Sequence, residues 1–361
     1  MPRRHGNLFN RIVAAENIEA AYHRARKGKG RMKNVKRFAM KKDQNLEKIR
    51  KTLVEKTFTT SKYQEKTIRE PKKRTIYVLP FSPDRIVQHA LMAIIEPIWD
   101  NMMLSDSYAC RVGKGVHRGS RRTMQFVRRY HYCLKCDVSK FYPSVDHAVL
   151  KRIIRRKIKC QNTLWLIDDI IDSFPGGKNV PIGNYTSQWF GNLYLNELDT
   201  FVKCTLKVGP YVRYCDDFCL FSDEKAQLRA AALSIENFLR DCLKLSMSKC
   251  DLFPVSHGVD FLGYRHFRRY VLLRKSTATR VMRRLSALPQ RLLRRKISKE
   301  SARSSLASTK GWMKWANTHN LKLALKIGEI ESFLDKEECG EAILGICKRA
   351  APDGRCKNED R

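Results

Sequence analysis

Acidic residues are scarce in this sequence, which carries 36 Asp and Glu against 72 Lys and Arg and so has a formal net charge of +36. Such an excess of positive charge suits a polyanionic partner, because each phosphate that a Lys or Arg contacts releases condensed counterions. A solubilising surface or a ribosome-associated protein would also tolerate this balance. Charge therefore favours a nucleic-acid partner and says nothing about catalysis.

Long apolar runs are also missing. No stretch of about 18 consecutive apolar residues occurs, and the basic N-terminus lacks the apolar segment of a signal peptide, so we expect no membrane span and a cytoplasmic location. Only Cys133 and Cys136 among the 12 cysteines form a CxxC pair. Residues three apart on a strand face opposite sides, so this pair does not predict a zinc site. Internal repeats are absent too.

The hydrophobic pattern predicts an α+β fold. Residues 1–75 are basic with a helical pattern, and a β-rich run follows Arg69–Arg74. The centre of the chain alternates expected strands and helices, and a helical stripe broken at Pro289 begins beyond Lys275. The expected strands are 134–138, 211–215 and 218–221, with two or three more ending near 273; the expected helices are 83–97, 147–158, 164–173, 186–203 and 228–242.

Three carboxylates follow or separate apolar strands. Asp216 and Asp217 stand between two short apolar runs, where a β-hairpin tip would present both side chains. Asp137 ends another expected strand about 80 residues upstream. Adjacent acids are common at turns simply because Asp favours them. If the strands are neighbours, however, the three acids repel one another unless cations lie among them, which predicts a site for two Mg²⁺ ions, with Mn²⁺ as a possible substitute.

These residues resemble the motifs of reverse transcriptases. The segment Cys136–His147 (CDVSKFYPSVDH) is similar to their first catalytic motif, Tyr214–Asp217 (YCDD) to their YxDD box, and Val259–Tyr264 (VDFLGY) to their primer-holding hairpin. Pro83–His89 and Ser107–His117 are similar to finger motifs of the bacterial enzymes. The matches occur in family order between Arg69 and Tyr264. The resemblance implies an RNA-directed DNA polymerase with fingers, a palm and a helical thumb.

The resemblance also implies a role for particular residues. Asp137, Asp216 and Asp217 would be catalytic and would bind the metal ions with the Val138 carbonyl. Tyr142 would exclude a ribose 2′-hydroxyl, although a core aromatic would give the same pattern. The remaining implied contacts are Lys72, Arg74 and Arg111 to the triphosphate, Lys249 to the pyrophosphate, and Phe261, Leu262 and Gly263 to the primer.

One motif narrows the resemblance. Most reverse transcriptases have Pro-Gln-Gly before the long palm helix, whereas this chain has Pro181-Ile182-Gly183, and Ser187-Gln188 stands where Ser-Pro is usual. This pattern, Gly311–Asn317 (GWMKWAN) and Asn7–Phe9 resemble the reverse transcriptases of diversity-generating retroelements, which are encoded by bacteria and phages. Ile182 offers none of the hydrogen bonds of Gln, so we expect it to bind nucleotides with lower fidelity. The family's mutagenesis at template adenines is implied only by the resemblance.

The resemblance sets the expected domains and partners. The expected parts are a basic N-terminal part of the fingers at 1–68, fingers at 69–130, a palm at 131–275, a thumb at 276–350 and a loose polar tail at 351–361. Partners would be template RNA, cDNA, dNTPs and a small basic accessory protein that forms a ring. Two alternatives stay open: a group II intron-type or retron reverse transcriptase of ordinary fidelity, and an inactive RNA-binding scaffold on the same fold.

Overall fold

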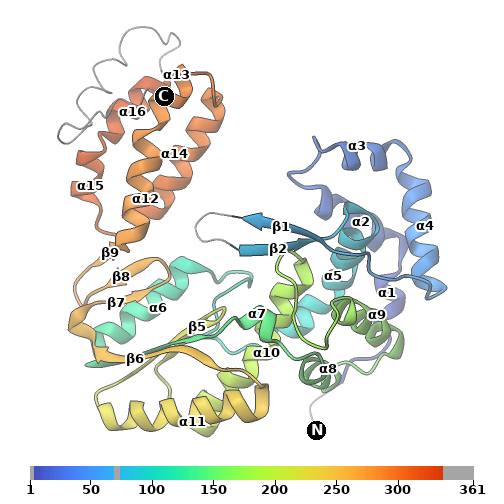
Figure 1. Ribbon diagram of the computed structural model, residues 1–361, viewed down its shortest axis with the longest axis horizontal. Helices are drawn as coiled ribbons and strands as arrows, with labels where there is room; N and C mark the ends of the chain where they lie inside the picture. Colours follow the sequence, from blue (N-terminus) through green and yellow to red (C-terminus); the bar gives the residue numbers. More distant parts are fainter. Residues whose placement is uncertain (1–3, 69–73, 336–361) are drawn as a thin grey trace, which may run out of the picture. The chain divides into compact units, whose positions relative to one another are not determined.

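The computed structural model describes residues 4–68 and 74–335. The chain divides into two compact units, which we describe one at a time. Unit 1 comprises Met1–Arg122 and His131–Phe253, and unit 2 comprises Thr123–Tyr130 and Pro254–Arg361. Figure 1 shows the helices and strands of each unit. Among the described residues, no helix is both long and apolar enough to cross a membrane.

Unit 1 begins with basic helices that share one apolar core. In α2, Ile18, Tyr22 and Ala25 are buried at helical spacing and face α5, while the arginines of the helix lie toward solvent. The expected helix at 83–97 is confirmed as α5, preceded by an irregular turn at Phe81–Arg85. The helices of this part are α1 (Phe9–Ile12), α2 (Ala15–Arg26), α3 (Lys33–Met40), α4 (Lys42–Val54) and α5 (Ile86–Asp100).

The helical prediction for the first 75 residues is wrong at its end. Residues Gln64–Ile68 form strand β1, which pairs antiparallel with β2 (Arg74–Val78) from Gln64 opposite Val78 to Ile68 opposite Arg74. The side chains of β1 are all exposed, so apolar periodicity gives no signal there. Pairing with β2, and not burial, accounts for this strand.

A four-stranded sheet in the order β4-β5-β3-β6 forms the centre of unit 1. The expected strands are confirmed: β5 lies between β3 and β4 and is antiparallel to both. Helix α11 packs against β3 and β5, and α10 packs against α11 (Figure 1). These elements are β3 (Tyr132–Val138), β4 (Tyr211–Tyr214), β5 (Asp217–Ser222), β6 (Met247–Pro254), α10 (Tyr185–Thr200) and α11 (Lys225–Leu243).

Shorter helices also begin in unit 1. Two of them confirm expected helices, and α8 begins where the Asp146 side chain accepts a hydrogen bond from the Val149 amide at 3.0 Å. Helix α6 begins in unit 1 and belongs to unit 2 from Thr123 onward, and none of the expected helices covers it. Its buried residues, Thr123, Met124 and Val127 among them, follow helical spacing. The elements are α6 (Val116–Arg129), α7 (Phe141–Ser144), α8 (His147–Arg155) and α9 (Gln161–Asp172).

Unit 2 combines a small antiparallel sheet with helices. Strands β7 (Val259–Phe261), β8 (Tyr264–His266) and β9 (Val271–Leu273) pair in that order. Tyr264 stacks on Trp312 of α14 at 5.4 Å between ring centroids. The expected break at Pro289 is confirmed, because Pro289 lies in the first turn of a new helix. The helices are α12 (Lys275–Ser286), α13 (Leu288–Leu293), α14 (Lys299–Lys314), α15 (His319–Ala324) and α16 (Ile327–Asp335).

Helices and antiparallel strands are thus combined in one chain, and the predicted α+β class is confirmed. The predicted boundaries of fingers, palm and thumb stay predictions. The strands that contain the predicted primer-holding residues belong to unit 2 together with the expected thumb helices. The expected polar tail lies outside the described residues.

Candidate active site

Three carboxylates meet at one end of the central sheet. Asp137 is the penultimate residue of β3, and Asp217 begins β5 directly opposite it in the antiparallel register. Asp216 lies in the two-residue turn that joins β4 to β5. The Val138 amide donates to the Asp216 carbonyl at 3.3 Å and ties this turn to β3. The pairing therefore brings together acids that are about 80 residues apart in the sequence.

The charge of Asp137 acts on Asp216. Burial raises the pKa of Asp216, and the charge of Asp137 raises it further, while Arg74 and Arg213 act in the opposite direction. Ser248 of β6 donates to Oδ2 of Asp137 at 2.8 Å. Lys135 places its Nζ 3.7 Å from Oδ2 of Asp217. Ser248 and Lys135 are contacts that the sequence motifs did not point to.

The oxygens gathered here have the chemistry that Mg²⁺ prefers, since carboxylates and carbonyls are hard ligands. Within residues 4–68 and 74–335, however, no three His, Cys, Asp or Glu side chains are grouped closely enough to hold a metal ion as they stand. Oδ2 of Asp137 is engaged by Ser248, and Oδ2 of Asp217 is close to Lys135. The oxygen ligands are therefore of the type that Mg²⁺ prefers, but the aspartate side chains would have to change rotamer to coordinate one ion together.

The predicted nucleotide-binding cations have different positions. Arg74 begins β2, is exposed, and lies close enough to Asp216 to lower its pKa. Lys249 is exposed on β6. Lys72 lies outside the described residues. Arg111 is a structural residue in this geometry: its side chain is 7% exposed, and its guanidinium bonds Oδ1 of Asp100 at 2.5 Å and the Leu104 carbonyl at 2.7 Å. A triphosphate contact for Arg111 stays a prediction.

Tyr142 and Ile182 lie on neighbouring segments. The Val180 amide donates to the Tyr142 carbonyl at 3.0 Å and joins the loop before α10 to α7. A side chain on Gly191 of α10 would approach the Tyr142 ring within 3.2 Å, so the bare glycine gives the ring its space. Burial raises the pKa of Tyr142, and the charge of Asp216 acts in the same direction. Tyr142 therefore lies near the Cys215–Asp216 turn, and Ile182 is half-buried in the adjoining loop.

The predicted primer-holding residues form a tight turn in unit 2. Phe261 ends β7, and Leu262 and Gly263 connect it to β8 with φ of +60° and +83°. Both values lie in the left-handed region that two-residue hairpin turns require. A side chain on Gly263 would lie 3.1 Å from the Trp312 ring. Within unit 2, this turn is therefore packed against α14.

Comparisons with known proteins found several similar chains. Protein YkfC of Escherichia coli (strain K12) is 27% identical over 259 residues, which are 59% of this chain and 66% of YkfC. The group II intron-encoded protein LtrA of Lactococcus lactis is 22% identical over 170 residues, 44% of this chain and 28% of LtrA. A telomerase structure from Candida albicans is 10% identical, with a TM-score of 0.48 over 82% of this chain and 67% of that chain.

The chain therefore spans about two thirds or less of the curated relatives that it matches. Residues 62–266, more than half of the chain, match the family described as reverse transcriptase (RNA-dependent DNA polymerase). This segment contains Asp137, Asp216 and Asp217, together with the strands that bring them into register. The chain belongs to the reverse transcriptase (RNA-dependent DNA polymerase) family.

Proposed function

We propose that this protein is an RNA-directed DNA polymerase whose nucleotidyl transfer is centred on Asp137, Asp216 and Asp217. The observation that carries the proposal is the register of the central sheet, in which Asp137 faces Asp217 and Asp216 occupies the adjoining turn. A fold alone does not establish chemistry, but a carboxylate cluster within a matched polymerase family supports it.

Two Mg²⁺ ions would be held by the three aspartates and the Val138 carbonyl, and Mn²⁺ is an alternative. When bound, the metal supplies a Lewis acid that activates a primer 3′-hydroxyl and stabilises the leaving pyrophosphate. The chain's own contribution is to fix the acids on paired strands. In this proposal Ser248 orients Asp137 and Lys135 limits the negative charge at Asp217.

Other residues would position the substrates. Arg74 would bind the triphosphate, which its electrostatic effect on Asp216 supports, and Lys72 and Arg111 would share this role. Tyr142, packed against Gly191, would exclude a 2′-hydroxyl. Lys249 would donate a proton to pyrophosphate, and Phe261, Leu262 and Gly263 would hold the primer.

We further propose that the enzyme is the mutagenic reverse transcriptase of a diversity-generating retroelement. Support comes from the sequence Pro181-Ile182-Gly183, in which no side chain offers the amide of a glutamine. Such an enzyme would copy a retroelement template RNA into cDNA with errors at template adenines. A small basic accessory protein that forms a ring would be its partner.

An intron-type or retron enzyme of ordinary fidelity is the second candidate. The similarity to a group II intron-encoded protein over 44% of this chain favours it. An inactive RNA-binding scaffold is a third reading, which the presence of all three aspartates disfavours.

One experiment tests these readings together. The full chain is given RNA template, annealed DNA primer, dNTPs and Mg²⁺, and its cDNA is sequenced beside that of Asp217→Asn. We expect the wild type to make cDNA with errors concentrated at template adenines, and the variant to lose at least about 10³-fold of its rate because it loses a charge that acts in the transition state. Template RNA binding, measured by filter retention, should not change.

Each outcome separates two readings. Accurate cDNA would retain the polymerase and assign it to the intron or retron type. Synthesis that persists in Asp217→Asn would refute the assignment of the catalytic acids. RNA binding with no cDNA, even after the element's own RNA and accessory protein are added, would indicate the scaffold.

A further inference from the structure

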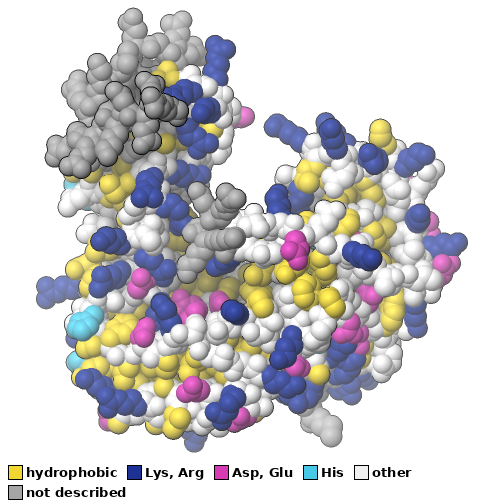
Figure 2. Space-filling model, viewed as in Figure 1, with side chains coloured by type: hydrophobic (Ala, Val, Ile, Leu, Met, Phe, Trp, Pro, Cys, Tyr) yellow, Lys and Arg dark blue, Asp and Glu magenta, His cyan; other side chains and the backbone are white. Residues whose placement is uncertain are grey.

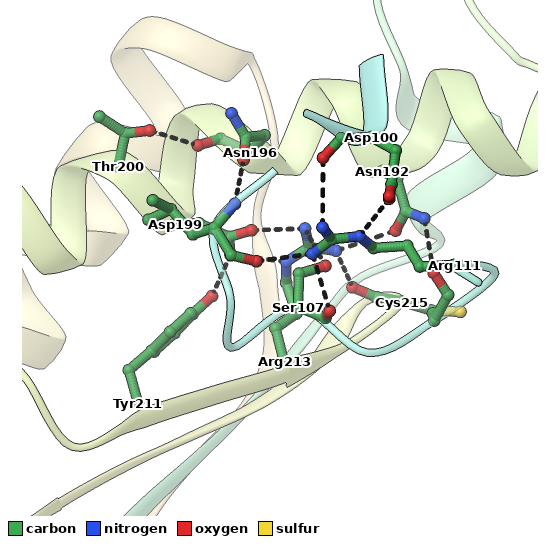
Figure 3. Close-up of polar contacts among 12 residues, drawn as sticks. Asp100, Ser107, Arg111, Asn192, Asn196, Asp199, Thr200, Tyr211, Arg213 and Cys215 are labelled. Carbon is green, nitrogen blue, oxygen red and sulfur yellow. Dashed lines mark hydrogen bonds and ion pairs between the residues drawn. The ribbon is translucent and has the colours of Figure 1, made fainter. Parts of the chain in front are cut away.

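A wholly buried arginine lies in the strand that leads to the catalytic turn. Arg213 is the third residue of β4, is 0% exposed and points into a polar network (Figure 3). Its Nε and Nη2 donate to the two carboxylate oxygens of Asp199, both at 2.6 Å. Three further bonds reach Ser107 Oγ at 3.0 Å, Asn192 Oδ1 at 3.3 Å and the Cys215 carbonyl at 3.0 Å. All five N–H donors of the guanidinium are therefore used.

The bond to the Cys215 carbonyl connects this network to the catalytic turn. Cys215 immediately precedes Asp216 and has φ of +54°, a left-handed conformation that is unfavourable for a residue with a side chain. The carbonyl oxygen of Cys215 and the amide nitrogen of Asp216 belong to one planar peptide unit. An arginine that fixes the oxygen therefore also limits the orientation of Asp216.

The other partners of Arg213 come from elements that do not depend on the turn. Asp199 and Asn192 lie seven residues apart on α10, so they share one face of the helix. Ser107 belongs to a segment that pairs with β4: the Arg213 amide donates to Asp106 at 2.9 Å, and the Tyr108 amide donates to Arg213 at 3.0 Å. The guanidinium is thus held by a helix and a paired segment on one side and contacts the turn on the other.

Stability alone does not account for this arrangement. The cost of desolvating two buried charges offsets most of their attraction, so a buried ion pair adds little net stability. Burial lowers the pKa of Arg213, but the charge and hydrogen bonds of Asp199 raise it more, and the net pKa is raised. The guanidinium therefore stays charged. A rigid fork with five directed donors specifies position in a way that an apolar core would not.

We propose that Arg213, held by Asp199, is a positioning residue that sets the Cys215–Asp216 peptide and so the placement of the Asp216 carboxylate. This role rests on the proposed function, in which Asp216 is a metal ligand. Arg213 itself touches neither substrate nor metal. Its effect passes through the backbone of the turn, and it extends the site to α10 and to the segment around Ser107.

The test compares Arg213→Lys with Tyr211→Phe in the full chain. Lysine keeps the charge beside Asp199 but lacks the fork that reaches both Asp199 and the Cys215 carbonyl. Tyr211 is also buried and donates to Asp199 Oδ1 at 2.6 Å, the oxygen that accepts from Nε of Arg213, so Tyr211→Phe disturbs the network at another point. Both variants are checked for folding by circular dichroism and thermal unfolding.

Two readouts follow. In primer extension we expect Arg213→Lys to lose roughly a hundredfold in kcat with little change in KM for dNTP, since small misplacements at a reacting centre cost this much. In Mn²⁺ binding by electron paramagnetic resonance, without nucleic acid, its Kd should rise by about tenfold, as for other residues that orient metal ligands. Tyr211→Phe should stay within about threefold of wild type in both assays, because its change does not reach the turn.

If Arg213→Lys does not fold, the double variant Arg213→Met with Asp199→Leu takes its place, because apolar replacement of a whole buried pair is often tolerated. It should show the same two losses. Mn²⁺ affinity and kcat equal to those of Tyr211→Phe in either folded variant would overturn the proposal. A wild type that makes no cDNA, even with the element's own RNA and accessory protein, would refute the proposed function, while the Mn²⁺ comparison would still decide the role of Arg213.

Discussion

Ile182 is held in place by its backbone and its neighbours. The Tyr77 amide donates to the Ile182 carbonyl at 3.0 Å. Gly183 has φ of +127°, and a side chain there would lie 2.5 Å from the Tyr77 carbonyl oxygen, so a glycine is required. Ser187 Oγ donates to the Pro181 carbonyl at 2.7 Å. A change of the Ile182 side chain therefore leaves the loop in place, which makes this position suitable for testing fidelity.

We predict that Ile182→Gln lowers the error frequency at template adenines by roughly threefold to tenfold, because one added hydrogen bond contributes about 0.5–1.5 kcal/mol. The measurement is deep sequencing of cDNA made on one RNA template. Ile182→Leu keeps the apolar character and should keep the wild-type error frequency. Equal error frequencies in the glutamine and leucine variants would show that the residue has no role in fidelity.

At the scale of residues, local patterns were sufficient for the carboxylates and insufficient for their supports. Asp137, Asp216 and Asp217 follow or separate apolar strands, so their positions at strand ends were predictable. Arg213 was missed because its partner Asp199 comes from another element. A charged residue inside an apolar strand, together with an acid in an apolar helix, was the available signal. The ion pair of Arg111 with Asp100 was likewise not predictable, because the two residues come from different segments.

At the scale of elements, burial decided what the sequence predicted. Strands β3 and β5 and helices α8 to α11 were predictable because each buries an apolar face. Strand β1 was missed because its exposed side chains carry no such signal. Helix α6 was missed because its first turn lies in a segment rich in glycine and basic residues. The pairing that gives β1 its structure is a tertiary property.

Strand β8 contains a buried histidine that makes the stability of unit 2 depend on pH. His266 is 0% exposed, and its Nδ1 lies 3.0 Å from the Val259 carbonyl. Burial lowers the pKa of His266 to about 4. In the unfolded chain its pKa is about 6.5. Between these values the unfolded state binds a proton that the folded state does not, so stability falls as the pH falls.

We predict that His266 lowers the free energy of unfolding by about 1.4 kcal/mol when the pH is lowered from 7.5 to 5.5, because the unfolded chain then binds a proton on this residue. In urea unfolding followed by tryptophan fluorescence, His266→Asn should be less stable than wild type at pH 7.5, and the difference should shrink by about that amount at pH 5.5. His257→Asn, at an exposed position of the same unit, should follow the wild type. A constant difference for His266→Asn would contradict the prediction.

At the scale of the whole molecule, positive charge is widespread. Figure 2 shows Lys and Arg side chains on the visible face of each unit. On α12, Val281 and Leu285 are buried while Arg283 and Arg284 are exposed, so the apolar stripe faces the core and the arginines face solvent. Some exposed cations are balanced locally, as Arg50 is by Glu47 at 2.8 Å. Cations of the net +36 that have an acidic neighbour should therefore contribute less to binding a polyanion than cations without one.

This charge predicts RNA binding that depends steeply on salt. If the enzyme contacts six to ten phosphates, its Kd for RNA should rise by about 10³-fold or more between 50 and 200 mM NaCl. Binding releases the counterions that are condensed on the contacted phosphates, and this release becomes less favourable as the salt concentration rises. Filter binding over this range gives the slope of log Kd against log salt. Arg283→Gln with Arg284→Gln should lower the slope by up to about two, and Arg50→Gln, whose charge Glu47 already balances, should leave it unchanged. A nearly flat slope would mean that the basic surface does not bind RNA through phosphates, and the partner would then have to be recognised by contacts that salt does not weaken.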